Sequence, residues 1–117
     1  MILRIVNFKL QDIDDEQYRH HAAAVAADFN QWAGLTAKIW LHDARTGTYG
    51  GAYLFSDQEA ADASRATDLF RGMESNPAFT DVSVQEYGVI EDLTAITGSL
   101  VLDLPNGTSA PRLVQHS

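Results

Sequence analysis

The sequence of 117 residues contains no cysteine, and that absence removes several kinds of chemistry at once. Without cysteine the chain can form no disulfide, no thiolate nucleophile and no cysteine-based metal site. The sequence also lacks an N-terminal signal pattern and any apolar run as long as a membrane span. These absences predict a cytoplasmic protein that does not enter a membrane.

Basic residues are scarce as well. Eight lysines and arginines stand against sixteen aspartates and glutamates, which gives a formal net charge of -8. Nucleic-acid binding draws its affinity from basic side chains that neutralise phosphates, so we expect no nucleic-acid partner. Glycine-rich nucleotide loops, the serine-hydrolase elbow and the His-Glu-x-x-His zinc motif are all missing from the sequence. We therefore expect neither a metal nor another cofactor.

The spacing of apolar residues predicts a single domain. Alternating patterns predict strands at residues 2–10 and about 80–90 and a pair of strands within 34–57, while helical spacing predicts two helices between them. This β-α-β-β-α-β order is that of a ferredoxin-like α+β fold, an antiparallel sheet with both helices on one face. We expect the domain to span residues 1–98, and residues 99–117 to form a C-terminal tail that docks on a partner subunit.

Local signals mark the ends of the predicted helices. Asp12 or Asp14 can cap the first helix, and Gly34 can end it in the manner of a C′ glycine. Ser56 and Glu59 have the spacing of a capping box at the start of the second helix.

Two polar residues occupy otherwise apolar patterns. Asn7 shares a strand face with Leu3 and Ile5, and is either a rim residue or a donor aimed into a cavity. His21 lies at the margin of a helical stripe that includes Phe29, and is either a core-edge histidine or a catalytic one.

The segment from Gly34 to Asp57 predicts a β-hairpin with two chemically different faces. If Asp43 pairs with Thr48 across the turn, one face is aromatic and polar and the other is aliphatic. The first face would carry the pairs Lys38–Tyr53, Trp40–Gly51 and His42–Tyr49, and the second Ala37–Leu54, Ile39–Ala52 and Leu41–Gly50. Neither face has the charges of a solvated surface. One face is expected to meet the alanine-rich helices and the other a partner subunit or a substrate; the aliphatic face suits the helices, but the sequence does not fix which face meets them.

The same hairpin resembles that of a known family. The segments Gly34-Leu35, Lys38-Ile39-Trp40 and Gly50-Gly51-Ala52-Tyr53-Leu54-Phe55-Ser56-Asp57 are similar to the YdhR-like monooxygenases. These are small members of the dimeric α+β barrel superfamily, which includes antibiotic-biosynthesis monooxygenases. The resemblance covers roughly residues 2–98 and implies a homodimer whose two sheets form a barrel, with a small-molecule cavity in each protomer.

For function, the resemblance implies a cofactor-independent monooxygenase whose small aromatic or polyketide-like substrate reduces oxygen as an anion. Such chemistry needs a base, for which His42 or Lys38 is the candidate, and a donor for the oxyanion, for which Asn7 is the candidate. Contacts to the substrate are expected from Trp40, Tyr53, Tyr49, His21 and Phe29. Haem-degrading relatives need an axial histidine on the second helix, and none lies between Asp57 and Met73.

Three alternatives stay open on the sequence. The same groups would serve a cofactor-free cyclase or isomerase, and the cavity would serve a non-enzymatic binder of a small hydrophobic or aromatic ligand. The aromatic face would instead be structural if it formed the wall between two sheets, with Lys38 paired to Glu86 across the barrel.

Overall fold

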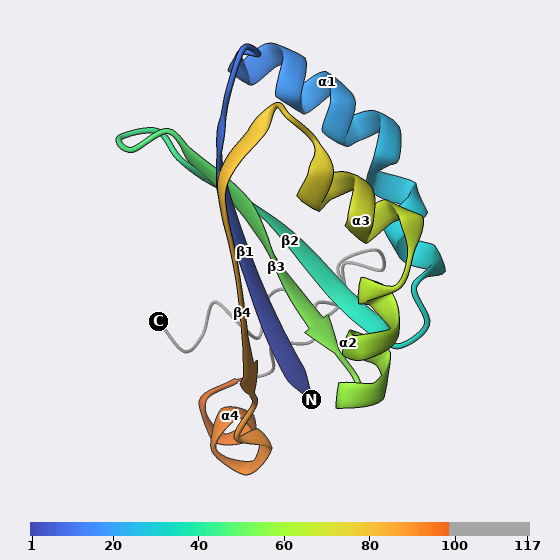
Figure 1. Ribbon diagram of the computed structural model, residues 1–117. Helices are drawn as coiled ribbons and strands as arrows, with labels where there is room; N and C mark the ends of the chain where they lie inside the picture. Colours follow the sequence, from blue (N-terminus) through green and yellow to red (C-terminus); the bar gives the residue numbers. More distant parts are fainter. Residues whose placement is uncertain (99–117) are drawn as a thin grey trace.

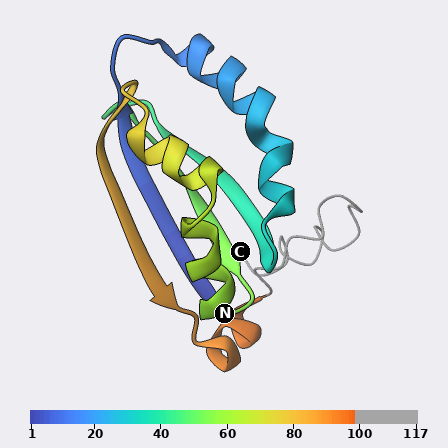
Figure 2. The same cartoon turned by 45° about the vertical axis from the view of Figure 1, so that its right-hand side comes forward.

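The computed structural model describes residues 1–98 and confirms the expected α+β architecture. In chain order its elements are β1 (Ile2–Leu10), α1 (Asp15–Val25), the 3-10 helix η1 (Ala26–Gln31), β2 (Leu35–Asp43), β3 (Thr48–Phe55), α2 (Gln58–Arg65), α3 (Asp68–Ser75), β4 (Phe79–Gly88) and α4 (Glu91–Thr97). The strands form one antiparallel sheet in the order β2-β3-β1-β4. Helices α1, α2 and α3 cover one face of this sheet, while α4 follows the end of β4 (Figures 1 and 2). Every helix in the described part of the chain is too short or too polar to cross a membrane.

Each of the two predicted helices is shorter than expected and is followed by a second helical segment. Asp14 caps α1 in a capping box with Gln17, and the chain then tightens into η1 before the turn at Gly34, whose φ is +80°. In the second helical region, Thr67 accepts a hydrogen bond from the Phe70 N–H and thereby starts α3 as a separate helix. The region over the sheet is therefore built from short helices rather than two long ones.

The predicted capping box at the start of α2 is wrong. Asp57, not Ser56, is the N-cap, because its carboxylate accepts from the Ala60 N–H. The Ser56 N–H instead donates to the Gly34 carbonyl oxygen, which extends the β2–β3 connection by one more bond.

The register predicted for the hairpin is confirmed along its whole length, from Asp43–Thr48 back to Ala37–Leu54. The sequence left open which face meets the helices, and in the structure the aromatic face lies against them. The reason is volume. The alanine-rich first helix offers little bulk, so aromatic side chains from the sheet fill the space between the layers, as expected for close-packed interiors. The buried aromatic members of this core include Phe8, Tyr49, Tyr53, Phe55 and Phe79.

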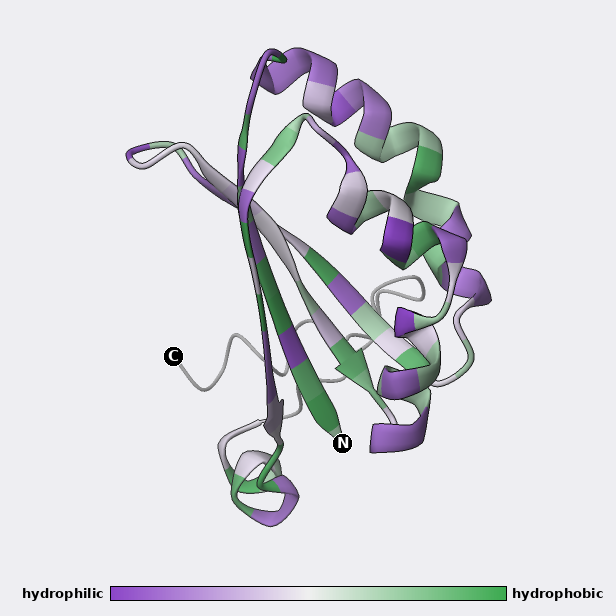
Figure 3. Ribbon diagram, viewed as in Figure 1, coloured by the Kyte–Doolittle hydropathy of each residue, from purple (hydrophilic) through white to green (hydrophobic). Residues whose placement is uncertain are grey.

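The aliphatic face of the sheet is not covered by any helix among residues 1–98. Ile39 is 44% exposed and Leu41 is 36% exposed, and Ile5 and Ala52 lie beside them on the same face. Figure 3 shows hydrophobic residues recurring along the strands that carry this face. An apolar surface of this kind on a sheet indicates an interface rather than a solvated back.

A buried cationic side chain on an inner strand links the sheet to helix α2. Arg4 on β1 is fully buried and donates to Glu86 at 2.8 Å, to Ser64 at 2.9 Å and to the Ala61 carbonyl oxygen at 2.7 Å. Arg65 also contacts Glu86, at 3.1 Å. Burial alone would raise the pKa of Glu86, but the hydrogen bonds from the two arginines outweigh it and hold that pKa below its usual value.

Candidate active site

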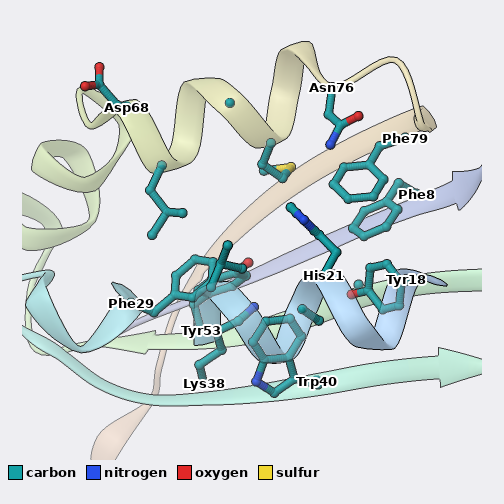
Figure 4. A pocket seen from close by; sticks show the side chains of 16 residues that line it. Phe8, Tyr18, His21, Phe29, Lys38, Trp40, Tyr53, Asp68, Asn76 and Phe79 are labelled. Atoms are coloured by element: carbon teal, nitrogen blue, oxygen red, sulfur yellow. The ribbon is translucent and has the colours of Figure 1, made fainter. Parts of the chain in front are cut away.

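A cavity of about 230 Å³ lies between the sheet and the helices α1, η1 and α3 (Figure 4). Its walls are mostly apolar and aromatic, and three ionisable groups other than tyrosine line it: Lys38, His21 and Asp68. The apolar and glycine part of the lining comprises Phe8, Ala22, Val25, Phe29, Trp40, Gly50, Leu69, Gly72, Met73 and Phe79, with Tyr18, Tyr53 and Asn76 completing it. The arrangement is that of a small-molecule site, in which a few polar groups converge on an apolar space.

The side chain of Lys38 ends among aromatic rings inside this cavity. Its Nζ atom lies 3.9 Å from the ring centre of Trp40, 3.9 Å from that of Tyr53 and 4.5 Å from that of Phe29. Among residues 1–98, this amine forms no hydrogen bond or ion pair, and Lys38 as a whole is partly buried. The rings attract an ammonium electrostatically, but an aromatic ring has no negative charge that would neutralise it.

Within one chain Lys38 does not pair with Glu86, for a reason that the register makes plain. One row across the sheet contains Lys38 on β2, Tyr53 on β3, Arg4 on β1 and Glu86 on β4. Lys38 and Glu86 therefore occupy opposite edges, and Arg4 stands between them and takes the single carboxylate of the row.

The isolation of Lys38 changes its acid–base behaviour. Burial without a counter-charge lowers the pKa of Lys38 to about 7, from the usual value of 10.5. The three ring faces favour the charged form and act against this shift. At neutral pH the group is thus divided between ammonium and free amine, which suits a general base or a nucleophile.

The Gly50-Gly51 pair makes room for this arrangement. A Cβ atom on Gly51 would lie 2.7 Å from the Nζ atom of Lys38, so the absent side chain provides the space in which the amine lies. A Cβ atom on Gly50 would lie 1.8 Å from the Val6 carbonyl oxygen, so this glycine instead permits the close approach of β3 to β1. The two glycines of the hairpin therefore serve different purposes, one for the site and one for the sheet.

Five of the residues singled out in the sequence are brought together in the cavity. Lys38, Trp40 and Tyr53 reach it from the sheet, and His21 and Phe29 reach it from α1 and η1. Burial strongly raises the pKa of Tyr53, so its hydroxyl remains protonated at neutral pH. His21 projects from α1 toward the middle of the cavity in Figure 4, with its ring centre 6.3 Å from that of Phe79.

His42 and Tyr49 do not line the cavity, although they share a sheet face with Lys38. They lie nearer the hairpin turn, along a separate groove. The exposed His42 ring stacks on Tyr49 with ring centres 4.4 Å apart, and the Tyr49 hydroxyl donates to Asp15 at 2.6 Å. That hydrogen bond raises the pKa of Tyr49. His42 therefore does not reach the cavity that Lys38 lines.

Asn7 belongs to the other face of the sheet. It pairs with Gly50 and Ser83 and alternates with Val6 and Phe8, which point to the helices. The donor role expected for Asn7 therefore does not apply to this cavity, since strand alternation directs its side chain to the open face.

Sequence analysis missed several residues that line the cavity: Phe8, Tyr18, Met73 and Phe79. Phe8 and Phe79 stack with ring centres 4.3 Å apart, and this pair closes one end of the site. Phe79 lies just before the strand predicted at about 80–90, yet it is the first residue of β4. Its alternation with Val82 and Val84 is interrupted at Asp81, whose φ is +54°, so the periodic signal does not extend back to it.

The fold of this chain is shared with several solved structures. Among solved structures, a "putative antibiotic biosynthesis monooxygenase" from Deinococcus radiodurans matches with a TM-score of 0.64 at 13% identity, over 76% of this chain and 92% of that one. SnoaB, a cofactor-independent oxygenase from Streptomyces nogalater, matches with a TM-score of 0.62 at 14% identity, over 75% and 91% of the two chains. The heme-degrader MhuD from Mycobacterium tuberculosis, solved with two hemes in its active site, matches with a TM-score of 0.63 at 16% identity, over 77% and 96%. At these identities the likeness shows a shared fold.

The family is defined by sequence. Residues 2–100 match the model of the family described as "Putative mono-oxygenase ydhR". The chain belongs to this ydhR family. None of the curated proteins matches it.

Proposed function

We propose that the protein is a monooxygenase that needs no cofactor, and that Lys38 is the base for a small aromatic or polyketide-like substrate held in the cavity. The observation that carries the proposal is the amine of Lys38, which lies among aromatic rings with a pKa lowered to about 7. Membership of the ydhR family and the description of SnoaB as a cofactor-independent oxygenase support the same reaction class.

The chemistry follows from an amine in an apolar space. The substrate loses a proton to the Lys38 Nζ atom, and the ammonium that results stabilises the substrate carbanion or phenolate. That anion transfers an electron to molecular oxygen, and the two radicals combine into a peroxide anion on the substrate carbon, which takes back the proton from Lys38 and becomes a hydroperoxide. Loss of water from the hydroperoxide converts a methylene into a carbonyl, so the substrate supplies all the electrons and the second oxygen atom leaves as water.

The dimensions of the cavity support a small ligand. Its volume of about 230 Å³ is below the roughly 300–1,000 Å³ of drug-sized sites. Trp40 and Phe29, with ring centres 5.8 Å apart at 84°, form a corner against which a planar ring can pack.

A cyclase or isomerase would use the same base without oxygen, and a binding protein would use the cavity alone. The presence of Lys38 and His21 in the cavity favours catalysis over storage, because a binder of apolar ligands has no need for a costly unpaired amine. No histidine is present on α2 or α3, so the sequence offers no axial ligand at the position expected for haem degradation.

Oxygen consumption with a panel of anthrones and naphthols tests the proposal. We expect Lys38→Met to lower the rate at least about a hundredfold, within the range for loss of a general base, and Lys9→Met to leave it unchanged. Equal product formation with and without oxygen would favour the isomerase, and binding without turnover would favour the binder. Turnover at the wild-type rate in Lys38→Met would remove Lys38 as the base.

We further propose a homodimer formed through the open aliphatic face of the sheet. The exposure of Ile39 and Leu41 on that face supports this arrangement. Ile39→Lys is expected to shift the protein to the monomer in sedimentation experiments, whereas Ala27→Lys on the exposed side of η1 leaves the assembly unchanged. A wild-type protein that sediments as a monomer would rule out the dimer.

The cytoplasmic location stays a prediction, and the docked arm lies outside the described residues.

A further inference from the structure

Lys38 has the surroundings of a nucleophile as well as those of a base. We propose that its ε-amino group captures aromatic aldehydes inside the cavity as a reversible imine. The inference rests on the cavity used in the proposed function, but it does not depend on the oxygen chemistry.

The first step of the argument is the position of the amine. The Nζ atom lies 3.9 Å from the ring centres of both Trp40 and Tyr53, on the wall of the cavity, and none of residues 1–98 forms a hydrogen bond or ion pair with it. The other ionisable groups that line the cavity are His21 from α1 and Asp68 from α3, with the hydroxyls of Tyr18 and Tyr53. A lysine activated by an apolar pocket is a recognised route to imine chemistry with carbonyl compounds.

The second step is the fit of the ligand. The rings around Lys38 provide faces and edges for an aromatic ring, and the small cavity suits one or two rings. A carbonyl carbon attached directly to such a ring would then lie next to the amine. Imine formation releases water, so an apolar site that excludes water favours the condensed product.

The reaction balances without an oxidant or reductant. The lone pair of the amine forms a bond to the carbonyl carbon while the carbonyl π electrons move to oxygen, and a proton passes from nitrogen to that oxygen. The nitrogen lone pair of the resulting carbinolamine then forms the carbon–nitrogen double bond as the carbon–oxygen bond breaks, a second proton passes from nitrogen to the departing hydroxyl, and water leaves. His21, which projects into the same cavity, is the group placed to carry this proton (Figure 4).

The chain has one other lysine, Lys9, and this residue serves as the internal reference for the reactivity of Lys38. Lys9 is exposed on β1, and the α-amino group of Met1 is held 2.6 Å from Glu91. At pH 7 an exposed lysine with a pKa of about 10.4 is less than about one-thousandth free amine. Lys38, with its pKa lowered to about 7, is free amine in a far larger fraction.

The test treats the wild-type protein with benzaldehyde and sodium cyanoborohydride at pH 7 under nitrogen, and locates the benzyl groups by peptide mapping. The hydride traps each imine as a stable amine. We expect Lys38 to be labelled at least about tenfold faster than Lys9, with the preference lost in concentrated urea. Equal labelling of the two lysines in the folded protein would overturn the proposal, and no variant is needed for that result.

Variants then test whether the position of the Lys38 amine, and not only its reactivity, determines the labelling. Gly51→Ala places a Cβ atom within 2.7 Å of Nζ, so it displaces the amine and is expected to slow labelling of Lys38 severalfold in a folded protein. Lys9→Arg is the matched control and leaves labelling of Lys38 unchanged. Unchanged labelling of Lys38 in Gly51→Ala would show that the cavity geometry does not direct the reaction. Because the readout is a mass adduct under nitrogen, a failure of oxygenase activity would leave this result standing.

Discussion

Arg4 and Lys38 form a natural comparison, because both point from the sheet toward the helices and both are cross-strand neighbours of Tyr53. Arg4 is fully buried and satisfied, with a carboxylate, a hydroxyl and a carbonyl oxygen as partners. Lys38 has aromatic rings around it and no such partner among residues 1–98. One row of the sheet thus contains a cation that holds the fold together and a cation that the fold leaves available.

The difference shows how a single carboxylate, that of Glu86, gives the two cations different roles. Glu86 accepts from Arg4 at 2.8 Å, so the desolvation of the guanidinium is offset by charge-assisted hydrogen bonds. Lys38 lies on the far edge strand, where no such offset is present, and burial acts on its pKa unopposed by any anion. Function is therefore expected at the cation whose charge the fold stabilises least.

The largest expected effect comes from breaking the satisfied cation. Arg4→Met leaves Glu86 without its main partner and removes the buried hydrogen bonds to Ser64 and the Ala61 carbonyl oxygen, so we expect the free energy of unfolding to fall by about 3–5 kcal/mol. Urea denaturation measures the change. Arg65→Met is the matched control: this arginine is 41% exposed and contacts the same carboxylate at 3.1 Å, so its loss is expected to cost about 1 kcal/mol or less. A smaller loss for Arg4→Met than for Arg65→Met would contradict the comparison.

The opposite sign is expected for the unsatisfied cation. Lys38→Met removes a charge that burial disfavours, so we expect the free energy of unfolding to rise by about 2 kcal/mol at pH 7, less than the full pKa shift would give because the rings attract the ammonium. The folded-state pKa of about 7 lies below the unfolded value of about 10.4, so the unfolded chain binds more protons between these values. Wild-type stability should therefore rise with pH across that window, relative to Lys38→Met. A difference between the two proteins that does not vary from pH 7 to pH 10 would refute the lowered pKa.

The hairpin explains how much of this fold could be predicted from sequence. Its register was predictable because the turn between Asp43 and Thr48 fixes every later pair, and its two faces were predictable because side chains alternate. Which face meets the helices was not predictable from alternation alone, since that depends on the volume available under a helix rich in alanine. For the same reason Asn7, a candidate donor for the cavity, lies on the open face instead.

The site was predictable only in part for a related reason. The sequence indicated that Lys38 and Tyr53 face the same way, but their environment depends on Arg4 and Glu86, which come from strands far away in the chain. Competition between two cations for one carboxylate is a property of the assembled row. No pattern in the sequence near Lys38 indicates this competition.

A smaller effect is expected from moving the available cation without removing it. Gly51→Ala forces the Lys38 Nζ atom out of its present position, and we expect the oxygenation rate to fall about tenfold, or about 1.4 kcal/mol in the barrier. Stability should change little, because the Cβ atom meets the end of a flexible side chain. The contrasting variant, Gly50→Ala, meets the Val6 carbonyl oxygen at 1.8 Å and should destabilise the sheet instead. If Gly51→Ala unfolds the protein while Gly50→Ala is tolerated, the roles assigned to the two glycines are reversed.

The smallest effect is expected at His42, which shares the sheet face of Lys38 but lies outside the cavity. Its exposed ring stacks on Tyr49, so His42→Ala should change stability by no more than about 0.5 kcal/mol and oxygenation less than twofold. His21→Ala is the matched change on the cavity wall and should slow oxygenation severalfold, because His21 reaches the same space as the amine. Initial rates of oxygen uptake compare the two variants under one set of conditions. A large loss in His42→Ala with none in His21→Ala would place the base in the groove beside Tyr49, and the unpaired state of Lys38 would then have no part in the reaction.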